Sequence, residues 1–279
     1  MDNTIRVSCE NNTATWQVEM GTTLSDLASR LGEQPHPFLA AMVNNRIKEL
    51  SYRIYTPVTV RFIDATSYAG IRVLQRTAWF ILQQAVGECF PDKKLYIRHS
   101  MGQSGFYCEV EGIESFGEAE ISTLQEAIER IIRADEPIHR RRMLTEEVRR
   151  LYEERGFDDK IELLESCPRL YSNLHTMGNE IGYFYGALAP SAGYLNHFCL
   201  RPYYKGFFIG LPLRTNPESA SCDALQEKMA DVFREYQSWV GMMGVPTVGA
   251  INNRIRTGQG GAMIKVAEET RRGEIGKAE

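Results

Sequence analysis

The sequence lacks both the long apolar stretch of a membrane span and a charge excess of either sign. Unbroken apolar runs such as residues 78–82 are far shorter than the ~20 residues that cross a bilayer. Lysine and arginine number 32 against 36 aspartates and glutamates, so the formal net charge is −4. This balance excludes a chain-wide polycation that binds nucleic acid, although it leaves room for a local basic patch. The first residues show no basic and apolar leader, so no signal peptide is expected.

Cysteine patterns typical of metal or redox sites are also missing. The six cysteines are Cys9, Cys89, Cys108, Cys167, Cys199 and Cys222, and none of them forms a CxxC pair. We therefore expect reduced, mostly buried thiols in a cytoplasmic protein that has no membrane partner. His197 and Cys199 could share a strand face, but zinc normally takes four ligands and no second pair stands near. The sequence therefore predicts no metal site.

What is present is the composition of a globular protein. The chain has 279 residues, of which 43% are hydrophobic and 24% charged. Its length favours about two domains.

Residues 4–64 have the pattern of a small mixed unit of strands and one helix. The alternating residues 5–9 and the strand-like residues 13–18 predict a hairpin. Thr23 precedes an apolar stripe with helical spacing, and Asp26 stands three residues later, which predicts a helix with a capping box. Further strand-like runs near the end of the segment favour a compact, ubiquitin-like roll.

The end of this segment carries a first resemblance. Residues 36–64, HPFLAAMVNNRIKELSYRIYTPVTVRFID, include Val43-Asn44, an Ile- and Leu-containing run and the closing Val60-Arg61-Phe62. This stretch resembles the TGS domain, a β-grasp module of threonyl-tRNA synthetases and some GTPases. The resemblance implies a β-grasp fold for residues 1–64.

The next part of the chain, residues 65–215, alternates helical and strand-like patterns. Apolar spacing predicts a helix over residues 71–90, and strand-like runs surround Gly102 and Gly105. Thr123 and Thr145 each precede a further helical pattern.

This part resembles the second additional domain of threonyl-tRNA synthetases, which also accompanies alanyl-tRNA synthetases. In that family an HSxAHxLxHA helix leads through a turn to a GFYYD strand. The corresponding segments here are residues 76–85, 90–94 and 105–109. The family domain hydrolyses mischarged tRNA with an HxxxH pair and a CxxxH pair.

The catalytic pairs of that family are replaced in this chain. The HxxxH positions fall on Arg76 and Phe80, and the CxxxH positions fall on Phe184 and Leu188. Phenylalanine and leucine can neither transfer a proton nor ligate a metal. We therefore expect no catalytic residues and no hydrolysis in this domain.

A third resemblance covers nearly the whole chain. Residues 99–112, 183–200, 232–255 and 264–275 resemble bacterial TGS-containing uridine kinases, in which the two synthetase-like domains precede a P-loop kinase domain. No GxxxxGK[ST] string occurs here, and Gly258-Gln259-Gly260-Gly261 reads as a turn between helices. The resemblance implies that ATP and magnesium serve a kinase domain absent from this chain, which would be the partner of the present region.

Aromatic and glycine residues concentrate in residues 181–213, where core packing and a ligand pocket are both open interpretations. In the second interpretation, a nucleoside or nucleotide stacks on Tyr185 or Tyr194. The candidate ligand-binding residues are Arg76, His99, Tyr107, Tyr185, Ser191 and Tyr194. This hypothesis predicts a concave pocket bounded by Arg76, Tyr107 and Tyr185.

A basic run offers a different binding chemistry. His139 and Arg140–Arg142 precede Arg149 and Arg150, and this set could grip RNA. Neighbouring glutamates can pair with such cations, which favours a solvated helix face.

The sequence as a whole predicts an α+β protein with a TGS domain at 1–64, a degenerate editing-like domain at 65–215 and a helical linker at 216–279. The function implied by resemblance is the non-catalytic regulatory or ligand-binding region of a uridine kinase. A free-standing aminoacyl-tRNA hydrolase and an RNA-binding module are the alternatives. The apolar stripe predicted for residues 225–240 leaves a homo-oligomer open.

Overall fold

The computed structural model describes residues 3–102, 105–223, 231–233, 240–241 and 243–278. The chain divides into two compact units, one made of residues 1–140 and 175–226 and the other of residues 141–174 and 227–279. Most of the predicted stripe at 225–240 lies outside the described residues.

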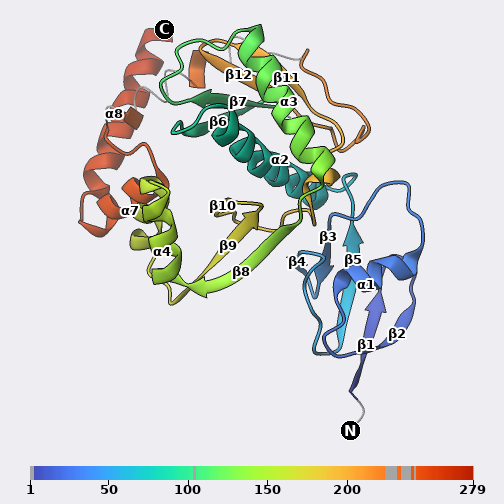
Figure 1. Ribbon diagram of the computed structural model, residues 1–279. Coiled ribbons are helices and arrows are strands. Elements are labelled where there is room, and N and C mark those ends of the chain that lie inside the picture. The colour runs from blue at the N-terminus through green and yellow to red at the C-terminus, as the bar shows by residue number, and fades with distance from the viewer. Residues whose placement is uncertain (1–2, 103–104, 224–230, 234–239, 242, 279) are drawn as a thin grey trace. The chain divides into compact units, whose positions relative to one another are not determined.

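The first unit begins with a five-stranded mixed sheet (Figure 1). Its strands are β1 (Thr4–Cys9), β2 (Thr15–Glu19), β3 (Ala40–Val43), β4 (Arg46–Lys48) and β5 (Val58–Ile63), in the order β2-β1-β5-β3-β4. β1 pairs antiparallel with β2 and parallel with β5. The predicted hairpin is therefore confirmed, and it packs on its own apolar cluster, which includes Val7, Leu24 and Leu27.

Local side chains set the ends of the elements in this sheet. Helix α1 (Leu24–Ala28) starts at Thr23, whose hydroxyl accepts a hydrogen bond from the Asp26 backbone, while Asp26 accepts from the Thr23 backbone. This is the predicted capping box. Asn44 and Asn45 have positive φ angles of 46° and 64° between β3 and β4, as the tight turn of a hairpin requires.

A second sheet of the first unit has four strands in the order β11-β12-β7-β6. The strands are β6 (Leu95–Met101), β7 (Gly105–Val110), β11 (Cys199–Tyr203) and β12 (Gly206–Gly210). Helices α2 (Tyr68–Cys89) and α3 (Glu118–Ala134) pack on one face of this sheet (Figure 1). Phe106 of β7, Phe207 of β12 and Leu82 of α2 belong to the resulting core.

The start of α3 differs from the prediction. The helix begins at Glu118, and Glu120 accepts a hydrogen bond from the backbone N–H of Gly117 at 2.9 Å. Thr123 lies inside the helix, where its hydroxyl donates to the Ala119 carbonyl. The Glu120 side chain therefore caps the helix at Gly117, four residues before Ile121, the first buried apolar residue of the helix.

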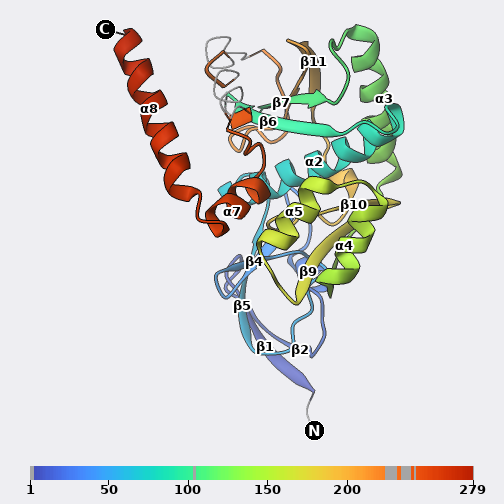
Figure 2. The same cartoon turned by 90° about the vertical axis from the view of Figure 1, so that its left-hand side faces the viewer.

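The second unit consists of helices α4 (Thr145–Glu154), α5 (Asp158–Ser166), α7 (Val248–Arg256) and α8 (Gly260–Ala278). The α5 and α7 helices lie side by side (Figure 2). Thr247 caps α7 and donates to Glu162 of α5 at 2.8 Å. A β-carbon added to Gly249 would lie 2.9 Å from the Leu163 nitrogen, so this glycine permits the close approach. Gly258 has a φ of 81° and forms the predicted turn before α8.

Strands β8 (Ile138–Leu144) and β9 (Tyr171–Met177) carry the chain from the first unit into the second and back. With β10 (Glu180–Gly182) they form a sheet in the order β10-β9-β8. None of the helices in the described part of the chain combines the length and apolarity that a bilayer crossing requires.

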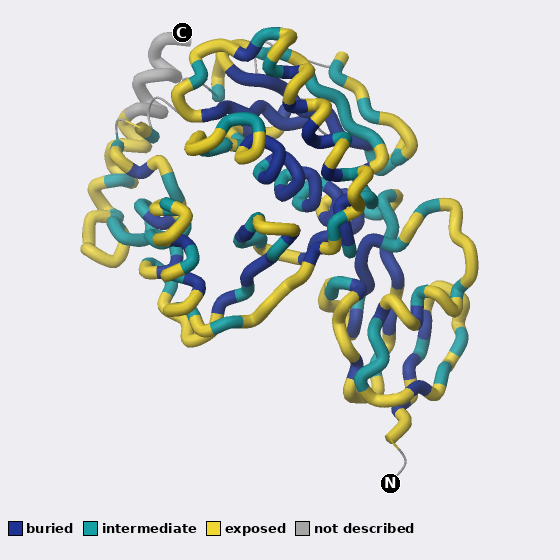
Figure 3. Tube along the Cα trace, viewed as in Figure 1, coloured by how far each residue is buried: buried dark blue, intermediate teal, exposed yellow. Residues whose placement is uncertain are grey.

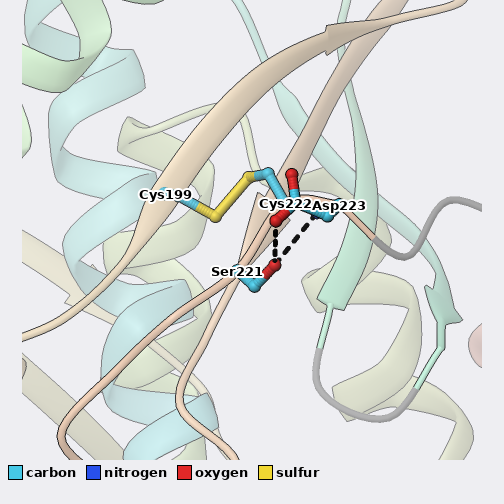
Figure 4. The surroundings of a disulfide bond; sticks show 4 residues. All are labelled: Cys199, Ser221, Cys222 and Asp223. Atoms are coloured by element: carbon cyan, nitrogen blue, oxygen red, sulfur yellow. Dashed lines mark hydrogen bonds between the residues drawn. A yellow bond between two sulfur atoms is a disulfide. The ribbon is translucent and has the colours of Figure 1, made fainter.

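The expectation of six reduced cysteines is wrong for two of them. Cys199 at the start of β11 is bonded to Cys222, which follows β12 (Figure 4). Ser221 and Asp223, on either side of Cys222, are joined by hydrogen bonds in the same turn. The remaining four cysteines are free.

Candidate functional site

Helix α2 supplies the first wall of the candidate site. The Ser67 hydroxyl accepts from the Gly70 backbone and starts the helix, which is buried over most of its length. Arg76 and Phe80 are one turn apart and therefore share a face. That face meets the loop of residues 183–190, so the four positions aligned with the synthetase catalytic pairs converge in the fold.

Arg76 is held by the backbone of this loop. Its Nε donates to the Ala187 carbonyl at 3.0 Å. Gly186 has a φ of 134°, and a β-carbon there would lie 2.8 Å from the Arg76 guanidinium carbon, so only glycine fits beside the arginine. Burial and the nearby Arg72 lower the pKa of Arg76, whereas Glu49 acts in the opposite direction. Since guanidinium groups stay protonated in proteins, Arg76 cannot accept a proton here.

The other three aligned positions fill the site with apolar atoms. Phe80 is fully buried, and its ring centroid lies 5.2 Å from that of Phe184. Leu188 is 1% exposed and belongs to the main core. Thr77, next to Arg76 on α2, accepts a hydrogen bond from the Ala189 backbone at 2.9 Å and fixes the loop against the helix.

A buried contact between a histidine and a glutamate, which the sequence did not reveal, lies beside these residues. His175 of β9 is fully buried, and its Nε2 lies 2.9 Å from Glu49 Oε1. The Leu188 backbone donates to the same oxygen at 3.4 Å, and Phe184 packs edge-on against the imidazole. The Nδ1 atom of His175 has no hydrogen-bond partner among the described residues. Leu174 and His175 are both buried on β9, so strand alternation does not single out His175, and no local signal singles out Glu49.

The predicted ligand residues fall into separate places rather than one pocket. Tyr185 is 87% exposed at the tip of the loop that holds Arg76. Tyr107 of β7 is 1% exposed, its hydroxyl donates to Glu109 at 2.9 Å, and its ring contacts Tyr203. Tyr107 is thus packed within the sheet, whereas Tyr185 faces solvent, and a pocket bounded by Arg76, Tyr107 and Tyr185 stays a prediction.

His99 accompanies Tyr107 on the four-stranded sheet. The two residues are paired across β6 and β7, and their rings are 5.4 Å apart. Burial lowers the pKa of His99, while Glu109 acts to raise it. Burial raises the pKa of Glu109, but hydrogen bonds from Tyr107 and Arg98 outweigh it and leave the pKa below the ordinary value of 4.5.

Ser191 precedes the short 3₁₀ helix of residues 192–194, and Tyr194 is its last residue. Ser191 is 9% exposed and bridges to Pro137. Burial, assisted by Asp135, raises the pKa of Tyr194. Tyr194 also lines a small cleft with His36 and other residues.

The cleft beside Tyr194 is too small for a nucleoside. Glu218 lies in its wall and approaches His36 at 2.9 Å and His197 at 3.6 Å. Its volume of 30 Å³ accommodates a few water molecules. Within the described ranges, no group of three potential ligands is arranged to hold a metal ion.

The basic run divides between a strand and a helix. His139 and Arg140–Arg142 are exposed on β8, whereas Arg149 and Arg150 lie on α4. On the helix, Arg149 pairs with Glu146 and Glu153, and Arg150 pairs with Glu146. The expected solvated helix face therefore describes only the second group.

Comparison with known proteins places the chain beside the synthetases. No protein-family model matches it. It is 28% identical over 195 residues to the threonine–tRNA ligase of Rubrobacter xylanophilus, covering 70% of this chain and 30% of that protein. The ligase of Carboxydothermus hydrogenoformans is 29% identical over 200 residues, with 71% and 30% covered. That of Lactobacillus acidophilus is 24% identical over 193 residues, with 69% and 29% covered.

The chain thus spans about 30% of the length of the curated relatives it matches. These matches confirm the synthetase part of the expected resemblance, and they do not show a relation to uridine kinases. The chain is thus similar to a part of threonine–tRNA ligases that makes up about 30% of their length.

Proposed function

We propose that this chain is an RNA-binding module, related to the N-terminal region of threonine–tRNA ligases, that does not hydrolyse aminoacyl esters. The observation that carries the proposal is the filling of the site where α2 meets the loop 183–190. Arg76, Phe80 and the Phe184–Leu188 segment occupy the positions at which the synthetase domain has its proton-transferring residues.

Hydrolysis needs a base within hydrogen-bond reach of a water molecule at the ester. Phe80, Phe184 and Leu188 cannot act as bases, and Arg76 remains protonated. His175 is the one imidazole in contact with these groups among the described residues, and it is fully buried with its Nε2 on Glu49. None of the four aligned positions therefore offers a proton acceptor, and the His175 imidazole is not accessible.

The chain still presents a side chain that can bind RNA, although the proton-transferring residues are replaced. Tyr185 stands 87% exposed next to Gly186, on the outer side of the loop. An exposed aromatic ring is a stacking platform for an unpaired base, with a contribution of about 1–3 kcal/mol per base. The homology to threonine–tRNA ligases supports tRNA as the nucleic acid.

Two measurements with the full chain test the proposal. Mischarged threonine tRNA is incubated with the protein, and we expect deacylation at the uncatalysed rate. Fluorescence anisotropy of a labelled threonine tRNA transcript should show saturable binding that weakens as salt rises. Turnover that Arg76→Ala abolishes would establish the hydrolase instead, and an absence of salt-dependent binding would refute the RNA-binding module.

A second candidate is the ligand-sensing region of a P-loop nucleoside kinase. It rests on the resemblance of residues 232–255 and 264–275 to TGS-containing uridine kinases. In that case a nucleoside or nucleotide is the ligand, and ATP and magnesium act only in the kinase domain. Isothermal titration with uridine separates the candidates, because the RNA-binding module predicts no heat of binding from a free nucleoside.

A further inference from the structure

We infer that the exposed residues 139–142 of β8, here called the basic ribbon, hold the phosphate backbone of the bound RNA. This inference rests on the proposed RNA-binding function and names the surface that performs it. The ribbon consists of His139, Arg140, Arg141 and Arg142, and β8 stands at the edge of the sheet β10-β9-β8.

Both faces of the strand are open at these positions. Side chains alternate along a strand, so Arg140 and Arg142 point to one face and Arg141 to the other. All three are exposed, as the burial colouring shows along β8 (Figure 3). With a strand rise of ~3.3 Å per residue, Arg140 and Arg142 stand ~6.6 Å apart, close to the spacing of successive phosphates in an RNA strand.

The described part of the protein places no counter-charge on two arginines of the ribbon. Among the residues that the structure describes, no ion pair or hydrogen bond involves the side chain of Arg140 or Arg141. Arg149, by contrast, is bound to carboxylates at 2.6 and 3.3 Å. The chain carries a net charge of −4, so these unpaired cations form a local exception to its overall charge.

The third arginine is oriented by an aromatic ring. The guanidinium carbon of Arg142 lies 4.6 Å from the ring centroid of Tyr171 on β9. Stacking of this kind fixes the plane of the guanidinium while leaving its N–H groups free to donate in that plane. Tyr171 is itself 45% exposed, so the pair is accessible from solvent.

Regular spacing and donor geometry favour a polyphosphate over an acidic peptide. Guanidinium groups donate two parallel hydrogen bonds to a phosphate, and each phosphate along RNA carries a charge at a fixed interval. Cations on consecutive residues of an exposed strand match such a repeating charge. The inference therefore commits to RNA, and an acidic protein partner is left as an outcome of the test.

The experiment compares two double variants of the full chain by anisotropy with labelled threonine tRNA at several salt concentrations. Arg140→Ala/Arg141→Ala should weaken binding at least tenfold and reduce the slope of log affinity against log salt by about two. Arg149→Ala/Arg150→Ala removes the same charge from α4 and should leave the slope unchanged, because its carboxylate partners already neutralise those arginines. Arg140→Lys/Arg141→Lys should restore the slope.

The outcomes separate this inference from the function on which it rests. If the unaltered protein does not bind tRNA, the proposed function fails. If it binds tRNA and the two alanine variants lose affinity equally, or neither does, only the basic ribbon is refuted. If polyglutamate displaces tRNA from the protein with equal potency and its binding depends on Arg140 and Arg141, the ribbon is a site for acidic proteins, and the inference is wrong.

Discussion

In both the N-terminal sheet and the region around α2, a helix packs on a sheet. The two regions differ in how far apart in the sequence the contacting residues lie. In the N-terminal sheet, Thr23 and Asp26 cap α1 across three residues, and Asn44-Asn45 close a turn by themselves. Around α2, Arg76 is held by a carbonyl 111 residues away, and His175 pairs with a carboxylate 126 residues away.

This difference explains why the first region is readable from local patterns and the second is not. A cap or turn depends on a few neighbouring residues and survives when the rest of the fold changes. The site around α2 exists only when distant segments meet, so each of its residues depends on the whole core. The comparison predicts that single substitutions near α2 cost more stability than substitutions at the N-terminal caps.

The largest effect is expected at Phe80. The ring is fully buried and contacts Phe184, so Phe80→Ala leaves a cavity in the main core. The free energy of unfolding should fall by about 3–5 kcal/mol in urea titration. Tyr68→Ala, at the 75% exposed first residue of the same helix, is the matched control and should cost little. An equal loss in both variants would mean that α2 is not the centre of this core.

A smaller loss is expected when the buried contact between Glu49 and His175 is broken. Glu49→Ala leaves the His175 imidazole buried without its carboxylate, which should cost about 1–3 kcal/mol in the free energy of unfolding. Glu10→Ala, which removes a carboxylate paired with Arg61 on the surface, should cost less than about 1 kcal/mol. Equal losses in the two variants would contradict the expectation that the buried contact between Glu49 and His175 contributes more to stability than a surface ion pair.

The N-terminal cap should come next. Thr23→Ala removes the hydroxyl that accepts from the Asp26 backbone, and the expected loss is about 1 kcal/mol. Thr23→Ser keeps the hydroxyl and should restore most of the stability. A loss above that of Glu49→Ala in chemical unfolding would reverse the order of the two regions.

Acid sensitivity should be the smallest effect. Hydrogen bonds from Tyr107 and Arg98 outweigh burial and hold the folded pKa of Glu109 below 4.5. A lowered folded pKa means that Glu109 stabilises the protein above pH 4.5 and that this contribution disappears as the pH falls through the folded value. The unfolding temperature of Glu109→Gln should therefore lie below that of the unaltered protein at pH 7 and approach it at pH 3. A difference in unfolding temperature that grows as the pH falls would contradict a lowered folded pKa for Glu109.

Sequence patterns predicted the elements well where the determinants are local. The hairpin, the α1 cap and the turn before α8 are all present, and the helix predicted over residues 71–90 is found at Tyr68–Cys89. The start of α3 was misplaced because two side chains, Glu120 and Thr123, could each serve as a start signal. The bond between Cys199 and Cys222 was missed because pairing depends on proximity in space rather than on spacing.

The candidate site was predicted in part. Alignment with the synthetase motifs brought Arg76, Phe80, Phe184 and Leu188 to one place, and the structure brings the same residues together. The sequence does not predict the contact of Glu49 with the buried His175, because His175 lies on a strand far along the chain. A local pattern also cannot distinguish an exposed basic strand from a basic helix. The sequence therefore groups residues 139–142 and 149–150 into one basic run, although they lie on β8 and α4.

The packing of α7 against α5 has a consequence for biosynthesis. Residues 141–174 leave the ribosome long before residues 247–256, yet Glu162 and Ser166 of α5 have hydrogen-bond partners, Thr247 and Asn252, in that later segment. The nascent helix α5 therefore lacks these contacts until residues 247–256 have been synthesised.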